Sequence, residues 1–366
     1  MLDPSLSRQR QQRLLDVMQQ RQLGAVVIGL PHHVYYLTAH LPGWQHQSAL
    51  VLTSDGQSWL ATANQPAKGA AADEVVAYEA NWMGTLRQEQ PHVVAAMVLE
   101  LLKSRGVRRI GIDASPVTSQ VALAFDGARE SVDPALWQIR RKKDRDELEL
   151  MKRAIACTKA MYRRAREIIA PGVPELTVFT ELNAAAVTTA GEPLSALLGN
   201  DYASGVGGGP ARKDKTAEAG HIYVLDLGPA VRGYFADNCR AFAVDRKPTD
   251  AQMKAWRAIT GVFPIVERTA KPGVRCRDIF DAVSRHLQDT YGKPMPHHLG
   301  HGVGLQPHEY PHLNPKWDDT LIEGELFTAE PGLYGPEING GIRIENQYLV
   351  TPDGVENLTP FPTELA

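Results

Sequence analysis

Residues 223–244 read YVLDLGPAVRGYFADNCRAFAV, two apolar runs on either side of a turn that contains Gly and Pro. Apolar runs bounded by turn formers are typical of a β-hairpin. A symmetric hairpin centred between Val231 and Arg232 would place Asp226 directly opposite Asp237. Opposed residues of antiparallel strands have their β-carbons about 4.5–5.5 Å apart. The stretch therefore predicts two carboxylates that point into one small volume.

A second stretch has the same design. Residues 326–350 read LFTAEPGLYGPEINGGIRIENQYLV, with a run of turn formers in the middle. A hairpin centred between Glu337 and Ile338 would place Glu330 opposite Glu345. The sequence thus predicts a second carboxylate pair on a second hairpin.

Four acids on largely apolar strands need a cationic partner. Two unit charges at about 4–5 Å repel by roughly 3–4 kcal/mol at an effective dielectric constant near 20. Arg343 precedes Glu345 by two positions and lies on the same face of the strand, but one guanidinium neutralises only part of this charge. Two divalent cations would neutralise all of it, so we expect a two-metal site.

A His-rich loop between the two stretches offers a nitrogen ligand. Residues 296–312 read PHHLGHGVGLQPHEYPH, and His301 has Gly300, Gly302 and Gly304 around it. Glycines remove side chains and let the backbone approach a crowded centre closely. Oxygen-rich ligation with one imidazole favours Mn, Co or Fe, with Zn as an alternative.

Each of these features alone has a simpler interpretation. An Asp beside a turn is usually a turn former or a solvated charge, and a His-rich loop is often polar surface. Two acid pairs and a glycine-flanked His at mutually consistent places favour the metal site over coincidence.

Composition narrows the class of protein. The 366 residues are 43% hydrophobic with a net charge of −3, which favours a folded chain with a peptide or small-molecule substrate over a nucleic-acid or membrane partner. Cys157, Cys239 and Cys276 have no Cys-x-x-Cys spacing, so neither disulfides nor a thiolate zinc site are indicated. Residues 1–22 are polar and carry no apolar signal segment, so we expect a cytoplasmic protein.

Two domains are expected, residues 1–140 and 141–366. Strands that alternate with helices in the first predict an α/β domain with an open sheet; the second, which begins with a long charged helix, is expected to be α+β with an antiparallel sheet. The strands expected in the first domain are Ala25–Gly29, Ser48–Thr53, Trp59–Ala63 and Arg109–Asp113, and its helices are Arg8–Gln22 and Val93–Ser104. The helices expected in the second are Lys142–Ile169, Glu175–Ala190, Asp250–Ala270 and Arg277–Tyr291.

At the acids and the His the chain resembles the pita-bread peptidases, a family that includes Xaa-Pro aminopeptidase, Xaa-Pro dipeptidase (prolidase), methionine aminopeptidase and the metal-free creatinase. The family pattern is two Asp, a His in His-Gly-x-Gly, a Glu in Glu-Pro-Gly and a Glu in Arg-x-Glu, and it is met at Asp226, Asp237, His301, Glu330 and Glu345. The resemblance implies a creatinase-like α/β domain, a pita-bread catalytic domain with a curved antiparallel sheet, and a homodimer.

The resemblance also implies roles for the ligands. Asp237 and Glu345 would bridge two metal ions, Asp226 would bind one of them, and His301 with Glu330 the other. A bridging hydroxide, formed from a water whose pKa both ions lower, would attack the scissile carbonyl while Glu330 handles the proton.

Three further residues match family positions. His297 and His308 correspond to histidines that contact substrate and stabilise the tetrahedral intermediate, although both would also fit a loop whose histidines are satisfied by the backbone. Arg343 corresponds to the Arg of Arg-x-Glu, which contacts the ligands from outside the metal shell.

One departure from the family concerns the substrate. The proline-specific members carry another substrate-contacting His upstream of the first Asp ligand, but residues 204–216 contain no His. Arg212, Lys213 or Lys215 are candidate substitutes. The first hypothesis is a dinuclear peptidase, either a dipeptidase or an aminopeptidase, that cleaves Xaa-Pro bonds. The alternatives are a same-fold hydrolase or lyase acting on a non-prolyl small molecule, and a catalytically silent binding module.

Overall fold

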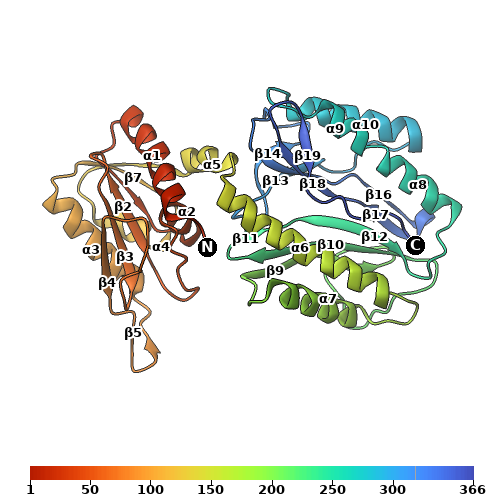
Figure 1. The fold of residues 1–366 in the computed structure, drawn as a ribbon, viewed down its shortest axis with the longest axis horizontal. Helices are drawn as coiled ribbons and strands as arrows, with labels where there is room; N and C mark the ends of the chain where they lie inside the picture. Colours follow the sequence, from red (N-terminus) through yellow and green to blue (C-terminus); the bar gives the residue numbers. More distant parts are fainter. Residues whose placement is uncertain (318) are drawn as a thin grey trace. The chain divides into compact units, whose positions relative to one another are not determined.

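The computed structural model describes residues 1–317 and 319–366, and contacts divide the chain into two units, Met1–Arg140 and Arg141–Ala366 (Figure 1). Each unit has its own sheets and its own buried core.

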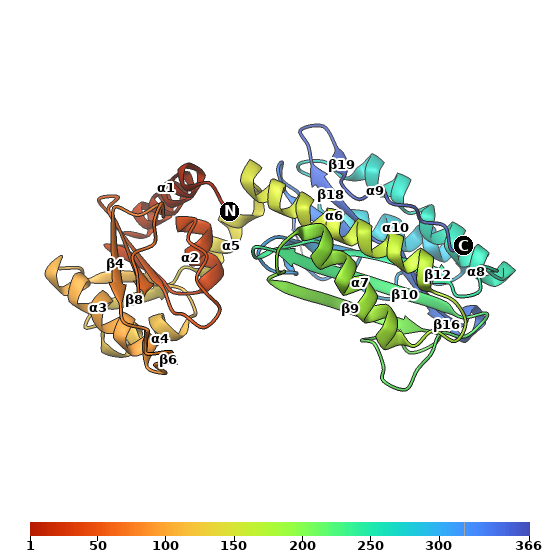
Figure 2. The ribbon, with the colours of Figure 1, turned by 60° about the horizontal axis from the view of Figure 1, so that its bottom comes forward.

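The first unit is built on one six-stranded mixed sheet in the order β4-β3-β2-β1-β7-β8. Pairs β1–β7, β7–β8 and β3–β4 are parallel, whereas β2 pairs antiparallel with β1 and β3. Helices cover both faces of the sheet, α1 and α2 on one and α3 and α4 on the other (Figures 1 and 2). The elements are α1 Pro4–Arg21, β1 Ala25–Ile28, α2 Pro31–Thr38, β2 Ala49–Thr53, β3 Ser58–Ala63, β4 Glu74–Tyr78, β5 Asn81–Trp82, β6 Thr85–Leu86, α3 Gln90–Ser104, β7 Arg109–Ile112, α4 Pro116–Ala124, β8 Ala128–Ser131 and α5 Asp133–Arg141.

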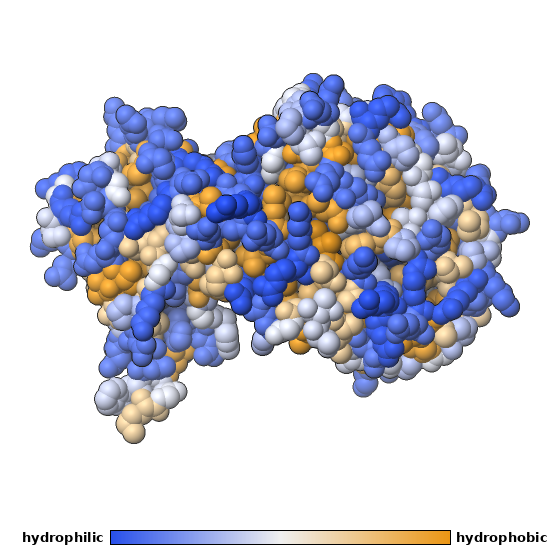
Figure 3. Space-filling view, in the orientation of Figure 1, coloured by the Kyte–Doolittle hydropathy of each residue, from blue (hydrophilic) through white to orange (hydrophobic). Residues whose placement is uncertain are grey.

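This architecture confirms the α/β prediction, and the four expected strands and two expected helices are present with ends shifted by a few residues. The two-residue strands β5 and β6 form a small hairpin that projects from the unit, with an apolar tip visible in Figure 3. Trp82 and Met83 at this tip are 69% and 89% exposed.

The second unit contains only antiparallel strand pairs among its described residues. Helices α6 and α7 cover a sheet of β9, β10, β11 and β12 (Figures 1 and 2). Helices α9 and α10 pack beside the sheet β14-β13-β15-β18-β19, and α8 packs on the two-stranded sheet β16-β17. The elements are α6 Arg145–Ile168, α7 Glu175–Ala190, β9 Ala196–Ser204, β10 Ile222–Val231, β11 Tyr234–Phe235, β12 Asn238–Ala243, α8 Asp250–Thr260, α9 Phe263–Thr269, α10 Cys276–Tyr291, β13 Gly300–Gly302, β14 Glu309–Leu313, β15 Leu326–Ala329, β16 Gly332–Gly335, η1 Pro336–Ile338, β17 Gly340–Arg343, β18 Asn346–Val350 and β19 Val355–Asn357. The α+β prediction is confirmed.

One predicted helix is wrong. The single helix expected over Asp250–Ala270 is two helices, α8 and α9, separated at Gly261. Pro264 lies in the first turn of α9. Since Pro lacks the backbone N–H that a continuous helix would need, the chain restarts a helix there.

The register of the first hairpin also differs from the prediction. Val231 pairs with Tyr234 and Asp226 pairs with Cys239, so Asp226 does not face Asp237. The turn consists of Arg232 and Gly233, whose φ angles of 48° and 86° suit a two-residue type I′ loop. The shift is two residues. Because side chains alternate with a period of two, Asp226 and Asp237 still project from the same face.

The second hairpin has the predicted register. Ala329 pairs with Asn346, Gly332 pairs with Arg343, and both ladders have the alignment that places Glu330 opposite Glu345. The two acids lie in the break between the ladders. There the Glu330 N–H donates to the Leu299 carbonyl at 2.7 Å and the Glu345 N–H to the Cys239 carbonyl at 2.9 Å. The second hairpin is thereby tied to β12 and to the His-rich loop.

Candidate metal centre

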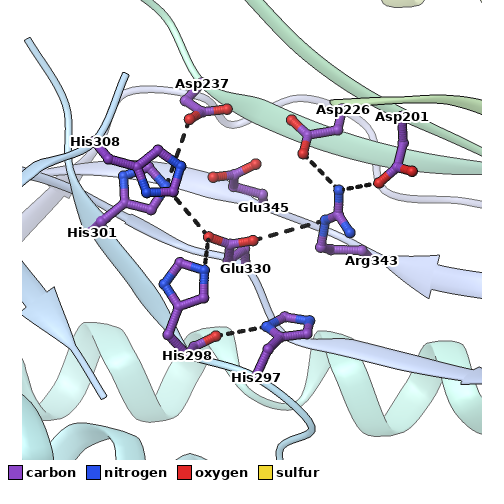
Figure 4. Close-up of a pocket in the computed structure, with 10 residues that line it drawn as sticks. All are labelled: Asp201, Asp226, Asp237, His297, His298, His301, His308, Glu330, Arg343 and Glu345. Atoms are coloured by element: carbon purple, nitrogen blue, oxygen red, sulfur yellow. Dashed lines mark hydrogen bonds and ion pairs between the residues drawn. The ribbon is translucent and has the colours of Figure 1, made fainter. Parts of the chain in front are cut away.

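The two hairpins and the His-rich loop enclose a pocket of about 230 Å³ in the second unit (Figure 4). All eight residues predicted for the site line it, together with two that were not predicted. The lining residues are Asp201, Asp226, Asp237, His297, His298, His301, His308, Glu330, Arg343 and Glu345.

The acids and His301 form two overlapping ligand sets. One oxygen each from Asp226, Asp237 and Glu345 lie within 4.8 Å of one another, and so do ligand atoms of His301, Glu330 and Glu345. Glu345 belongs to both sets. The Asp237 carboxylate also lies 3.7 Å from His301 Nε2, and Glu330 Oε1 lies 3.5 Å from the same nitrogen. This arrangement suits two cations that share carboxylates.

The buried carboxylates repel one another when no cation lies between them. Burial, followed by repulsion from Asp226 and Glu330, raises the pKa of Asp237 well above its ordinary value. Burial and repulsion from Asp237 do the same to the pKa of Glu345. For Glu330, burial and Asp226 raise the pKa to about 8. Among the described residues, the buried Glu345 Oε2 has no hydrogen-bond partner. The donor set therefore fits divalent ions.

His301 is oriented as a neutral nitrogen ligand. Its Nδ1 lies 3.0 Å from the Gly302 carbonyl, which assigns the ring proton to Nδ1 and leaves the lone pair of Nε2 facing the acids. Burial lowers the pKa of His301 to about 3. The flanking glycines are needed for the approach of neighbouring strands, because a β-carbon at Gly300 would overlap the Thr328 carbonyl and one at Gly302 the Tyr310 carbonyl.

The other histidines surround this group. His308 stacks on His301 with ring centroids 3.6 Å apart and is exposed at the rim. His297 Nδ1 lies 2.7 Å from the His298 carbonyl, and its Nε2 lies 3.0 Å from the Tyr334 hydroxyl. His298, which was not predicted, brings Nε2 to 3.4 Å from Glu330 Oε1. Its side chain therefore lies beside the predicted ligand Glu330.

Arg343 enters the pocket from the side opposite His301 and His308 (Figure 4). Its Nη2 lies 2.6 Å from Asp226 Oδ2 and 2.5 Å from Asp201 Oδ2, and its Nε lies 3.8 Å from Glu330 Oε2. Asp201 was not predicted as a site residue. It reaches the pocket because β9 pairs with β10 and places Asp201 directly opposite Asp226.

Arg212, a candidate substitute for the missing histidine, does not reach the pocket. The Arg212 guanidinium is held by Glu175, with Nε at 2.9 Å from Oε2 and Nη2 at 2.6 Å from Oε1. Lys213 and Lys215 are exposed. None of the three lines the pocket.

Fold and pocket together define a metallopeptidase. The sequence pattern of Metallopeptidase family M24 matches residues 149–352, and that of the Creatinase/Prolidase N-terminal domain matches residues 10–140. The chain belongs to Metallopeptidase family M24. This is the family that the acids and His301 indicated.

Known relatives agree with this assignment. An Xaa-Pro dipeptidase of Pyrococcus horikoshii is 29% identical over 269 residues, which cover 71% of this chain and 75% of the relative. One of Pyrococcus furiosus is 30% identical over 241 residues, 64% of this chain and 68% of the relative. The solved structure of an Xaa-Pro dipeptidase from Bacillus anthracis superposes with a TM-score of 0.84 at 23% identity, covering 98% of this chain and 99% of the other, and so shares the fold.

Two further observations concern the helices and the cysteines. None of the helices within residues 1–317 and 319–366 combines the length and the apolar character needed to cross a bilayer. Cys157, Cys239 and Cys276 are buried free thiols.

Proposed function

We propose that the chain is a dinuclear metal-dependent peptidase that cleaves Xaa-Pro bonds, as a dipeptidase or an aminopeptidase. The observation that carries the proposal is the pair of ligand sets that share Glu345 in a pocket lined by histidines. The resemblance of the chain to Xaa-Pro dipeptidases supports the substrate class.

The proposed metal ligands are Asp226, Asp237, His301, Glu330 and Glu345, with Asp237 and Glu345 as the bridging pair. Two divalent ions bound there would polarise a substrate carbonyl and lower the pKa of a water molecule. Mn²⁺ is the proposed metal, with Co, Fe or Zn as alternatives, because oxygen ligands with one imidazole suit these ions.

The surrounding side chains have separate tasks in this proposal. Glu330 would both bind an ion and handle the proton of the attacking water, and its carboxylate lies beside the His298 and His301 imidazoles. His297 and His308 contact the substrate, His297 through Nε2 beside the Tyr334 hydroxyl and His308 from the rim. Arg343 orients the carboxylates of Asp226 and Glu330.

A panel of peptides tests the substrate class. Mn²⁺-loaded protein is expected to hydrolyse Ala-Pro, Gly-Pro or longer Xaa-Pro peptides and to leave Ala-Ala and Gly-Ala largely intact. Elemental analysis of the same sample is expected to give about two ions per chain. Bound metal without turnover of any prolyl peptide would reject the Xaa-Pro assignment.

A second candidate is a same-fold hydrolase or lyase that acts on a non-prolyl small molecule. The observation that favours it is the loop of residues 204–216, which has no His and whose Arg212 is engaged by Glu175. Hydrolysis of non-prolyl amides in the same panel would support this candidate. A silent binding module is disfavoured, since all five proposed ligand residues converge in one pocket.

We further propose a cytoplasmic homodimer. Three reduced thiols suit a reducing compartment, and the dimer rests on the family resemblance. Light scattering after gel filtration measures the assembly directly, and a mass of one chain would reject the dimer.

A further inference from the structure

Asp201 is fixed at the edge of the proposed metal site. Its Oδ2 accepts a hydrogen bond from Arg343 Nη2 at 2.5 Å, and its Oδ1 accepts a short hydrogen bond from the Gly209 N–H. The side chain is 14% exposed. Both carboxylate oxygens are therefore held by defined donors, and the orientation toward Arg343 is built into the fold.

The Gly-rich loop supplies one of these donors. Gly207, Gly208 and Gly209 have φ angles of 107°, 38° and 97°, a region that side-chain-bearing residues rarely adopt. A β-carbon at Gly208 would lie 3.0 Å from Asp201 Oδ1. The glycines thus let the loop close over the Asp201 carboxylate, in the segment where proline-specific relatives would carry a histidine.

Arg343 is the charged group with which Asp201 forms an ion pair. Its side chain is only 11% exposed, and a buried guanidinium is costly without a carboxylate partner. Apart from Asp201, the acids paired with it in the described residues are Asp226 and Glu330, both proposed metal ligands. Without Asp201, Arg343 would pair with those two ligands alone, and its positive charge would oppose the entry of a cation.

Charge balance points the same way. The pocket holds five carboxylates and one guanidinium. While the bound water is neutral, two divalent ions together with Arg343 carry as many positive charges as the five carboxylates carry negative ones. Removal of the Asp201 charge would leave a net positive centre in a buried site, where excess charge is expensive.

We infer that Asp201 is the dedicated counterion of Arg343, a positioning residue that leaves Asp226 available to the metal. The inference rests on the proposed dinuclear function. It assigns a task to a carboxylate that does not belong to the five-ligand pattern and to the Gly-rich loop that holds it.

Calorimetric titration of the metal-free full-length protein with Mn²⁺ tests this role without any substrate. Asp201→Asn is expected to weaken Mn²⁺ binding by about 10- to 100-fold, the usual effect of removing a group that orients a ligand. Asp201→Glu keeps the charge and is expected to restore most of the affinity. In an Arg343→Met background, adding Asp201→Asn is expected to leave the affinity unchanged, because the competing guanidinium is gone.

Glu175→Gln is the matched control. It removes another carboxylate that pairs with an arginine beside the same strand, β9, but outside the pocket. This variant is expected to lose thermal stability and to keep the wild-type Mn²⁺ affinity. Circular dichroism melts report whether each variant is folded. Should Asp201→Asn fail to fold, the comparison of Arg343→Met with the double variant carries the test.

Three results would overturn the inference. Unchanged Mn²⁺ affinity in folded Asp201→Asn would remove Asp201 from the metal site while leaving the peptidase proposal intact. An equal loss in the wild-type and Arg343→Met backgrounds would mean that Asp201 acts on the metal by itself. Wild-type protein that binds no Mn²⁺ would overturn this inference and the proposed function together.

Discussion

Asp237 is buried between the two hairpins, close to carboxylates from both of them. Its pKa is raised by burial and by Asp226 and Glu330, so Asp237 loses its proton less readily than an ordinary Asp. A side chain kept in such a position lowers the stability of the metal-free fold. The proposed bridging role gives this arrangement a physical reason, because a pair of cations would turn the repulsion into attraction.

Replacement of Asp237 by Asn distinguishes an effect on catalysis from an effect on folding stability. Asp237→Asn should reduce kcat/KM for an Xaa-Pro peptide by more than the roughly 10- to 100-fold that outer contacts of a metal site cost. The metal-free variant should melt at the wild-type temperature or higher, since the amide keeps the volume and removes a repelled charge. Steady-state kinetics and thermal melts measure the two effects.

Asp214→Asn serves as the control, since Asp214 is exposed and does not line the pocket. It should match the wild type in both measurements. A near wild-type rate in Asp237→Asn would show that the ligand assignment is wrong.

The two hairpins show how far element geometry could be predicted. The turn of the second hairpin lies in one symmetric run of turn formers, so its register follows from the sequence. The first offers several turn formers, and the positive φ of Arg232 and Gly233 selects a centre that the pattern alone did not identify. Asp201 was missed because β9 pairs with β10 across a long loop, and such non-local pairing leaves little local signal.

Strand β13 depends on glycine for its close packing. Gly302→Ala should destabilise the protein by about 1–3 kcal/mol, the usual cost of overpacking, because the new methyl group would overlap the Tyr310 carbonyl. His301 lies on the same strand, so Mn²⁺ affinity should fall as well. Chemical denaturation and calorimetry report the two changes.

Gly354→Ala is the matched substitution, since nothing lies within 4 Å of a β-carbon at that position. It should change neither stability nor Mn²⁺ affinity by a comparable amount. Equal effects of the two substitutions would contradict the packing argument for β13.

For the whole molecule, the buried acids link folding to pH and to metal. Glu330 has a pKa of about 8 in the folded chain against an ordinary 4.5, and the pKa values of Asp237 and Glu345 are also raised. A carboxyl group whose pKa is raised by folding stabilises the fold fully below its ordinary pKa. That contribution is lost as the pH rises through the folded pKa.

The metal-free protein should therefore melt at a lower temperature at pH 8 than at pH 6. Mn²⁺ should raise the melting temperature more at pH 8, because the ligands must lose their protons to bind it. Scanning calorimetry with EDTA or with Mn²⁺ measures both trends. Glu330→Gln should weaken the pH dependence in EDTA, and equal melting temperatures under all four conditions would contradict the linkage.

The cross-link between the hairpins has a consequence for how cations are exchanged. Besides the Glu345 N–H bond to Cys239, Arg240 Nη1 donates to the Glu345 carbonyl at 2.6 Å, and the Asn238 amide donates to the same oxygen. These backbone and side-chain hydrogen bonds hold the two hairpins together without any metal ion. In the proposed site, one divalent ion could then replace another while the hairpins stay joined, so that ionic size and ligand preference would select among Mn, Co, Fe and Zn.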